Sequence, residues 1–193
     1  MVSSQADKAA SHARIVDRAA ARFRRDGVNG VGVAELMKEA GLTHGGFYRH
    51  FASRDDLVAE AVEHALEQGN QWFLTAAARG GQQAFTTIVD DYLSTAHRDA
   101  PQDGCAVAAL PQDVSRADDR TRAAYGRQVE SYLSILAGLA SGDDPAADRR
   151  QAFLALSAMV GAIAMARAVG DPELSTEILI ETAAALKELP EPR

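Results

Sequence analysis

Apolar residues recur at α-helical spacing through nearly the whole chain, and this period constrains the fold more than any other feature. Ile15, Ala19 and Phe23, for example, lie four residues apart and therefore share one helical face. No segment of the sequence shows the sustained alternation of apolar and polar residues, rich in β-branched side chains, that marks a half-buried strand. We therefore expect an all-α fold.

Glycine, proline and capping residues divide this pattern into about nine helices. Gly27 and Gly41 end the first two, and Ser53 caps the fourth. The third and the later helices are expected over residues 43–51, 82–98, 120–140, 146–169 and 173–188. Each of the last two follows an Asp-Pro pair, in which the aspartate caps the helix and the proline occupies its first turn.

The 193-residue chain carries 20 Lys and Arg against 27 Asp and Glu, so its formal net charge is −7 and its pI is about 5.2. Taken alone, this acidity argues against a nucleic-acid partner. The charge is unevenly spread, however, because residues 8–54 hold nine basic and four acidic residues, whereas residues 61–193 hold 11 basic and 19 acidic ones. The sequence thus predicts a small basic N-terminal part and a larger acidic remainder.

Composition excludes several protein classes. Hydrophobic residues make up 47% and charged residues 24%, which excludes a collagen-like, mucin-like or wholly disordered chain. The lone cysteine, Cys105, excludes an internal disulfide and a multi-cysteine metal site, and it fits a reducing cytoplasm. The N-terminal residues lack the apolar region of a signal peptide. We expect a cytoplasmic protein with no cofactor and no metal ion.

The segment that follows Gly41 has one apolar side and one side rich in hydrogen-bond donors. Leu42, Phe47 and Phe51 can pack inward, and the residues that remain outward or at the N-terminal end include no acid. These outward residues are Thr43, His44, Gly45, Gly46, Tyr48, Arg49 and His50. Donors bind phosphates and base edges, and small residues permit close approach. Two short helices joined across Gly41 therefore predict a helix-turn-helix that binds DNA.

Nearby arginines support this interpretation. Four of them lie within about 80° of one another around the first helix and are suited to follow a phosphate backbone, although a solvated and partly neutralised helix face explains them equally well. They are Arg14, Arg18, Arg22 and Arg25. Arg54 adds a cation at the start of the next helix, where phosphate is attracted. His50 has an alternative role as a packed residue at a helix end.

The run from Val33 to Leu57, VAELMKEAGLTHGGFYRHFASRDDL, closely resembles the DNA-binding domain of TetR-type transcriptional regulators. The marks of this family are the Gly-Leu-Thr turn, the Phe-Tyr-x-His-Phe recognition helix and the Ser-Arg-Asp-Asp-Leu start of the next helix. The resemblance covers residues 12 to about 60. The remainder is similar to the family only in length, helix content and its closing helix pair.

The resemblance implies a bacterial homodimer that places one recognition helix per subunit in the major groove of a palindromic double-stranded DNA operator. Its C-terminal domain would bind a small-molecule effector and pair with its twin through the last two helices. Carried over by position, contacts with phosphates or bases are implied for Thr43, His44, Gly46, Tyr48, His50 and Arg54. Gly32 stands where the family usually has Ser or Thr, and it removes a donor that often touches DNA.

These observations give the expected domain organisation. It consists of a disordered tail over 1–9, a three-helix helix-turn-helix domain over 10–53 that is completed to about residue 60, an effector-binding and dimerisation domain over 54–189, and a tail over 190–193.

The stretch from Ala152 to Ala166 is apolar on all sides. At about 1.5 Å per residue it spans about 22 Å, short of the roughly 30 Å hydrocarbon core, so we expect no membrane partner. A soluble helix of this kind must be covered on two sides. Because a monomer would leave much of it wet, we expect a two-fold homodimer through the last two helices.

We expect the effector to bind among the middle helices, where large side chains gather. The candidates are Trp72, Tyr92, Cys105, Tyr125, Phe153 and Met159. Aromatic and methionine side chains at helical spacing more often belong to a core than to a ligand site. Cys105 begins a helix, where a thiol pKa falls, and both a sensing role and a packed apolar role remain open.

Two other function classes fit the sequence less well. An all-helical enzyme is disfavoured because the sequence has no phosphate loop, dinucleotide fingerprint or Gly-x-Ser-x-Gly motif, and no motif places a base beside Cys105. A helical interaction module, or a small-molecule-binding protein without DNA binding, is the alternative. The sequence thus favours a ligand-responsive regulator that is not an enzyme; repression is the usual mode of the family, and activation stays open.

Overall fold

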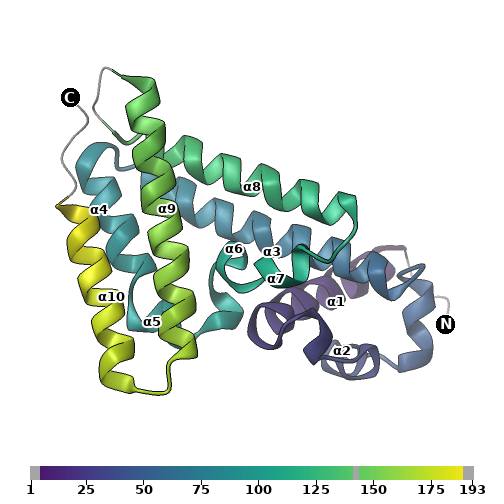
Figure 1. Cartoon of the computed structure of the whole chain (residues 1–193). Coiled ribbons are helices and arrows are strands. Elements are labelled where there is room, and N and C mark those ends of the chain that lie inside the picture. Colours follow the sequence, from purple (N-terminus) through teal and green to yellow (C-terminus); the bar gives the residue numbers. More distant parts are fainter. Residues whose placement is uncertain (1–4, 141–143, 189–193) are drawn as a thin grey trace.

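The computed structural model describes residues 5–140 and 144–188, and all regular elements in these ranges are helical (Figure 1). The α-helices are α1 (Gln5–Asp26), α2 (Val33–Glu39), α3 (Arg54–Ala77), α4 (Gly81–Tyr92), α5 (Thr95–Asp99), α6 (Ala106–Ala109), α7 (Pro111–Val114), α8 (Asp119–Ala137), α9 (Pro145–Ala168) and α10 (Pro172–Lys187). Short 3-10 helices are η1 (Val28–Gly30), η2 (His44–Arg49) and η3 (Pro101–Asp103). The all-α fold expected from the sequence is confirmed.

The N-terminal domain is built around α1, α2 and η2. Phe23, Leu36 and Phe47 contribute one buried side chain from each of these helices. Gly41 joins α2 to η2 with φ at 74°, a left-handed conformation that costs other residues about 1 kcal/mol or more. The turn predicted at this glycine is therefore present, and it sets the direction in which η2 leaves α2.

Two expectations about the N-terminal domain are wrong. Residues 5–9 belong to α1 and not to a disordered tail, because Ala-rich sequence favours helix and Asp7 suits the positive end of the helix dipole. Residues 1–4 and the tail expected over 190–193 lie outside the described residues. Residues 44–49 form a 3-10 helix where an α-helix was expected. Gly45 and Gly46 each destabilise an α-helix by about 1 kcal/mol relative to alanine, so the segment forms a short 3-10 helix in place of an α-helix.

The expected helix over residues 82–98 is divided into α4 and α5. The break falls at Ser94, whose Oγ accepts a hydrogen bond from the His97 backbone N–H at 3.1 Å and so caps a new helix. The sequence pattern did not show this break because apolar spacing continues across it. The division turns His97 toward the interior of the C-terminal domain.

The long helix α3 connects the two halves of the molecule. Ser53 caps it as predicted, with Oγ accepting from the Asp56 N–H at 3.1 Å. Near its start Leu57 is buried, and near its end the ring of Phe73 stacks on Tyr132 of α8 with 4.0 Å between centroids. Packing of α3 against both α1 and α8 makes it common to both domains.

Helices α9 and α10 pack against each other on the side of the molecule away from α2 (Figure 1). Asp144 and Asp171 cap them as predicted, each accepting from backbone N–H groups in the first turn. Five large apolar side chains are 44–59% exposed, and we call them the outer α9–α10 face. They are Phe153, Leu154, Met165, Leu174 and Ile180. By length and composition α9 alone, among the described residues, is apolar enough to cross a membrane, as core helices of soluble proteins also are.

Candidate nucleic-acid interface and ligand cavity

The donor-rich surface predicted after Gly41 lies on the outside of η2. Phe47 points inward and is 2% exposed, whereas its neighbour Tyr48 is 77% exposed. Thr43, His44 and Arg49 are exposed as well. Thr43 precedes η2 in extended conformation without capping it by its side chain, so its hydroxyl is not engaged there. This recognition surface, residues 43–49, thus presents hydroxyl, imidazole and guanidinium donors to solvent and holds no carboxylate.

The remaining predicted DNA contacts differ in their surroundings. His50 is half-buried, and its Nδ1 has no hydrogen-bond partner among the described residues. Burial lowers the pKa of this imidazole. Arg54 donates from Nη2 to the Val28 carbonyl at 2.6 Å, and Arg14 donates from Nη2 to Ser11 Oγ at 3.0 Å. Arg14 remains exposed, so its guanidinium can still reach a phosphate.

The arginine stripe of α1 is not uniform. Arg22 is bound by three carboxylates, with Nε donating to Asp26, Nη2 to Glu35 and Nη1 to Glu39. Its hydrogen bonds to Asp26 and then Glu35 raise its pKa. Because Glu35 and Glu39 belong to α2, Arg22 ties α1 to α2. Only the exposed part of the stripe is free to meet a polyanion.

A cavity of about 370 Å³ lies in the C-terminal domain between α3, α4, α5, η3 and α8. Its aromatic walls are Trp72, Phe73, Tyr92 and Tyr132. Trp72 meets Phe73 edge to face at 5.0 Å between centroids. Gly69 also lines the cavity, and a Cβ there would lie 2.5 Å from the Tyr132 hydroxyl oxygen. The absence of a side chain at Gly69 therefore allows the Tyr132 hydroxyl to lie directly against α3.

Half of the predicted ligand-binding residues line this cavity. Trp72, Tyr92 and Cys105 do, whereas the other three do not. Tyr125 donates its hydroxyl to the Val107 carbonyl at 2.7 Å, and burial raises its pKa to about 12. Met159 is fully buried in the core and does not line the cavity.

Phe153 is the third residue outside the cavity. It lies on the outer α9–α10 face, where the Arg149 guanidinium sits over its ring at 5.2 Å from the centroid. This placement is outside the cavity, so a ligand contact for Phe153 stays a prediction that the cavity does not support. Periodicity identifies an apolar residue, but it does not show whether that residue meets a cavity, a core or solvent.

The polar groups of the cavity include one unsatisfied donor. Tyr92 is 1% exposed, and its hydroxyl has no hydrogen-bond partner among the described residues. Burial raises the pKa of this phenol, so it stays protonated and able to donate. The Cys105 thiol lies in the same wall and is also buried. A buried hydroxyl without a partner is costly, and a ligand that accepts from it removes the cost.

His97 is fixed between two backbone groups. Its Nε2 accepts from the Cys105 N–H at 3.0 Å, and its Nδ1 lies 2.6 Å from the Tyr92 carbonyl oxygen. An acceptor at Nε2 and a donor at Nδ1 describe the neutral ring. Burial, partly offset by the Tyr92 carbonyl, lowers the pKa of His97 and favours the same form. The ring thus holds α4 and the start of α6 together at the cavity wall.

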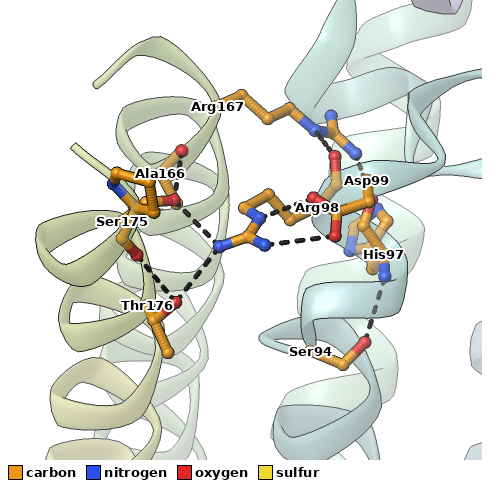
Figure 2. Close-up of polar contacts among 9 residues, drawn as sticks. Ser94, His97, Arg98, Asp99, Ala166, Arg167, Ser175 and Thr176 are labelled. Carbon is orange, nitrogen blue, oxygen red and sulfur yellow. Dashed lines mark hydrogen bonds and ion pairs between the residues drawn. The ribbon is translucent and has the colours of Figure 1, made fainter. Parts of the chain in front are cut away.

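The wall formed by α5 is tied to α9 and α10 (Figure 2). Arg98 donates from Nη1 to Ser175 Oγ at 3.0 Å and to Thr176 Oγ1 at 3.3 Å. Arg167 of α9 donates to the carbonyls of His97 and Arg98 at 2.6 Å and 3.1 Å. The cavity wall and the α9–α10 pair are therefore connected by direct hydrogen bonds.

Arg24 is the cavity residue that the sequence reasoning missed. It belongs to α1 but is only 8% exposed and lines the cavity of the C-terminal domain. Its Nε donates to the Gln102 carbonyl at 2.7 Å and its Nη1 to Gln68 Oε1 at 2.9 Å. The sequence contains no local signal for this role, since the partners lie more than 40 residues away.

Comparisons with known proteins agree with this architecture. The family model for bacterial regulatory proteins of the tetR family matches residues 15–61. No curated protein sequence gives a significant match. Among solved structures, a TetR transcriptional regulator from Chloroflexus aurantiacus J-10-FL is 20% identical, with a TM-score of 0.79 and 95% of each chain covered.

Two further solved structures have the same fold. The reduced form of NemR from E. coli is 19% identical, with a TM-score of 0.76 over 92% of this chain and 95% of that one. SCO4454, a TetR-family transcriptional regulator from Streptomyces coelicolor, is 22% identical, with a TM-score of 0.69 over 97% of this chain and 95% of that one. The segment over residues 15–61 is thus similar to the DNA-binding domain of bacterial regulatory proteins of the tetR family, and the chain as a whole shares the fold of TetR-family transcriptional regulators.

Proposed function

We propose that the protein is a ligand-responsive transcriptional repressor that binds a palindromic operator as a homodimer and is released by a small molecule. The observation that carries this proposal is the recognition surface, where Tyr48 and Arg49 are exposed on η2 above a tightly packed apolar side. Donors of this kind fit phosphates and base edges. The basic charge of residues 8–54 attracts DNA to this end of the chain. A protein that binds the chromosome of a bacterium acts in the cytoplasm, which is the location that we propose.

The homodimer is supported by the outer α9–α10 face. Exposed side chains such as Met165 and Ile180 lie on the two helices that the sequence predicts as a dimer interface. Several large exposed apolar side chains on one helix pair favour association. Two-fold pairing would present two recognition surfaces to the two halves of a palindrome.

The cavity supports a small-molecule effector. It combines aromatic walls with the unsatisfied Tyr92 hydroxyl, a combination typical of ligand sites. Arg98 and Arg167 connect its wall to α9 and α10, so occupancy can be transmitted to the subunit arrangement. About 100-fold preference of the effector for the non-binding conformer corresponds to about 2.7 kcal/mol, which is sufficient for release.

The test is DNA binding by the full chain, measured by fluorescence polarisation on the DNA upstream of its own gene. We expect the double variant His44→Ala with Tyr48→Phe to bind at least about tenfold more weakly, because two contacts of the recognition surface are lost. Arg122→Ala, on the exposed side of α8, is the matched control and should leave binding unchanged. Unchanged binding by the double variant, with its oligomeric state intact, would contradict the assignment of the recognition surface. Absence of DNA binding by the unsubstituted protein would favour a small-molecule-binding protein that does not bind DNA.

A further inference from the structure

The cavity contains a buried cation that no acid neutralises by direct contact. Arg24 is 92% removed from solvent, yet its hydrogen bonds go to the carbonyls of Ala65 and Gln102 and to the Gln68 amide oxygen. No ion pair involves it among the described residues. Burial lowers the pKa of Arg24, and the nearby charges of Asp103 and Asp17 offset this only in part. Neutral acceptors solvate a guanidinium incompletely, so this buried charge is costly.

The guanidinium also retains capacity to donate. Its Nε and Nη1 are engaged, but Nη2 makes no hydrogen bond with a described residue. Arg24 lines the cavity, as does Tyr92, whose buried hydroxyl lies near Cys105 and has no other hydrogen-bond partner among the described residues. The site therefore offers one cationic donor and one neutral donor to the same small volume. Both would be satisfied by a ligand that brings oxygen acceptors, and a carboxylate matches a guanidinium best.

The rest of the cavity specifies the body of the ligand. Trp72, Phe73 and Tyr132 provide ring faces and edges, and the Phe73 and Tyr132 rings already stack on each other at 4.0 Å. Flat aromatic rings fit such walls by stacking or edge contacts. The two acids that also line the cavity, Asp91 and Asp103, are exposed, so water screens their charge in part, although the charge of Asp103 still acts on Arg24.

We propose that the cavity binds a small aromatic carboxylate and that Arg24, a residue of α1 in the DNA-binding domain, binds its carboxylate. This inference rests on the proposed function for the biological meaning of the ligand, but not for its chemistry. It places the effector in direct contact with the helix that packs on α2. To bind the carboxylate fully, Arg24 must share or release its hydrogen bond to Gln102 of η3.

The first experiment compares two ligands that differ only in charge. The full-length protein is titrated calorimetrically with 2-naphthoate and with its neutral isostere, 2-naphthamide. We expect 2-naphthoate to bind about tenfold more tightly or better, because a hydrogen bond to a charged group is stronger than a neutral one. Trp72 is the only tryptophan of the sequence, so quenching of its emission by 2-naphthoate places the ligand in this cavity. Equal binding of acid and amide, or binding without quenching, overturns the proposal.

The second experiment removes the cation. Arg24→Met should lose about tenfold in affinity for 2-naphthoate and keep its affinity for 2-naphthamide within about twofold. Arg25→Met is the matched control, since Arg25 is the exposed neighbour on α1 and is paired with Asp26. Arg24→Lys retains a charge and should bind the acid more tightly than Arg24→Met does. Loss of acid and amide binding together in a folded Arg24→Met protein contradicts a carboxylate contact.

Two controls separate this inference from the function on which it builds. Circular dichroism reports whether Arg24→Met folds; if it does not, the comparison of acid with amide in the unsubstituted protein decides. Operator binding is measured independently in the absence of ligand. A protein that binds DNA but does not prefer the acid disproves the ligand class and leaves the repressor standing. A protein that binds the acid through Arg24 but no DNA supports the ligand class and disproves the repressor.

Discussion

The recognition surface on η2 and the outer α9–α10 face are both exposed, but they are exposed in opposite ways. On η2 the apolar Phe47 is buried, and the donors of Tyr48 and Arg49 are turned outward. On α9 and α10 it is large apolar side chains such as Met165 and Ile180 that face solvent. The first surface suits a polyanion, and the second suits another apolar surface. The difference indicates two kinds of partner: exposed polar donors suit a charged partner at one end of the chain, and exposed apolar side chains suit an apolar partner at the other.

The largest effect is expected from a charge placed in the outer α9–α10 face. Met165→Glu combined with Ile180→Glu should raise the dimer dissociation constant by about a hundredfold or more, because an unpaired buried carboxylate costs several kcal/mol. Sedimentation velocity measures this directly. Leu74→Glu, at a leucine on α3 that is 45% exposed, is the control and should leave the proposed dimer intact. If the dimer survives the double substitution, the outer α9–α10 face is not the dimer interface.

The recognition surface should respond to loss of a single cation. Arg49→Ala is expected to weaken DNA binding about tenfold and to reduce the slope of log affinity against log salt by about 1, since one phosphate contact is lost. Polarisation titrations at several salt concentrations give both quantities. Arg122→Ala should change neither, because Arg122 lies on α8. An unchanged salt slope for Arg49→Ala would mean that its guanidinium does not face DNA.

A smaller effect separates the two kinds of arginine on α1. Arg22→Ala should lower the free energy of unfolding by about 1 kcal/mol, or about 2–4 °C in Tm, because its contacts with Glu35 and Glu39 join α1 to α2. Arg18→Ala should leave Tm unchanged, since Arg18 is exposed on the same helix. Thermal denaturation followed by circular dichroism provides the measurement. Equal Tm values for both variants would show that the Arg22 network adds nothing to stability.

The smallest effect concerns pH. Burial lowers the pKa of His97, so the folded state binds fewer protons than the unfolded state below the ordinary value of 6.5. Stability should therefore fall as the pH drops below about 6.5, and the loss is complete once the pH is below the folded pKa. In His97→Asn this part of the slope disappears, while His50 still contributes equally in both proteins. Tm measured between pH 5 and 8 tests the difference, and parallel curves would contradict it.

Residues that end or begin helices could be predicted from the sequence. Gly41, Ser53 and the Asp-Pro helix starts were identified because each depends on backbone geometry within a few residues. The two sides of η2 were also predicted correctly in their exposure, although its 3-10 form was not.

The cavity was predictable only in part, because it is made by long-range packing. Trp72 and Tyr92 were chosen as large side chains and do line it, but the same criterion selected Phe153, which lies on the outer α9–α10 face. Arg24 was counted only as positive charge, and its burial depends on η3, 78 residues further along the chain. Spacing identifies which residues share a helical face; it does not identify what that face meets.

The length of α3 has a mechanical consequence. From the Ser53 cap beside the recognition surface to the Trp72 wall of the cavity, this helix extends about 29 Å. As a rigid rod that pivots at the cavity, it would move its N-terminal end about 2.5 Å for a tilt of about 5°. Successive base pairs are about 3.4 Å apart along the DNA axis. A tilt of a few degrees at the cavity would thus displace the proposed recognition surface by most of the spacing between base pairs.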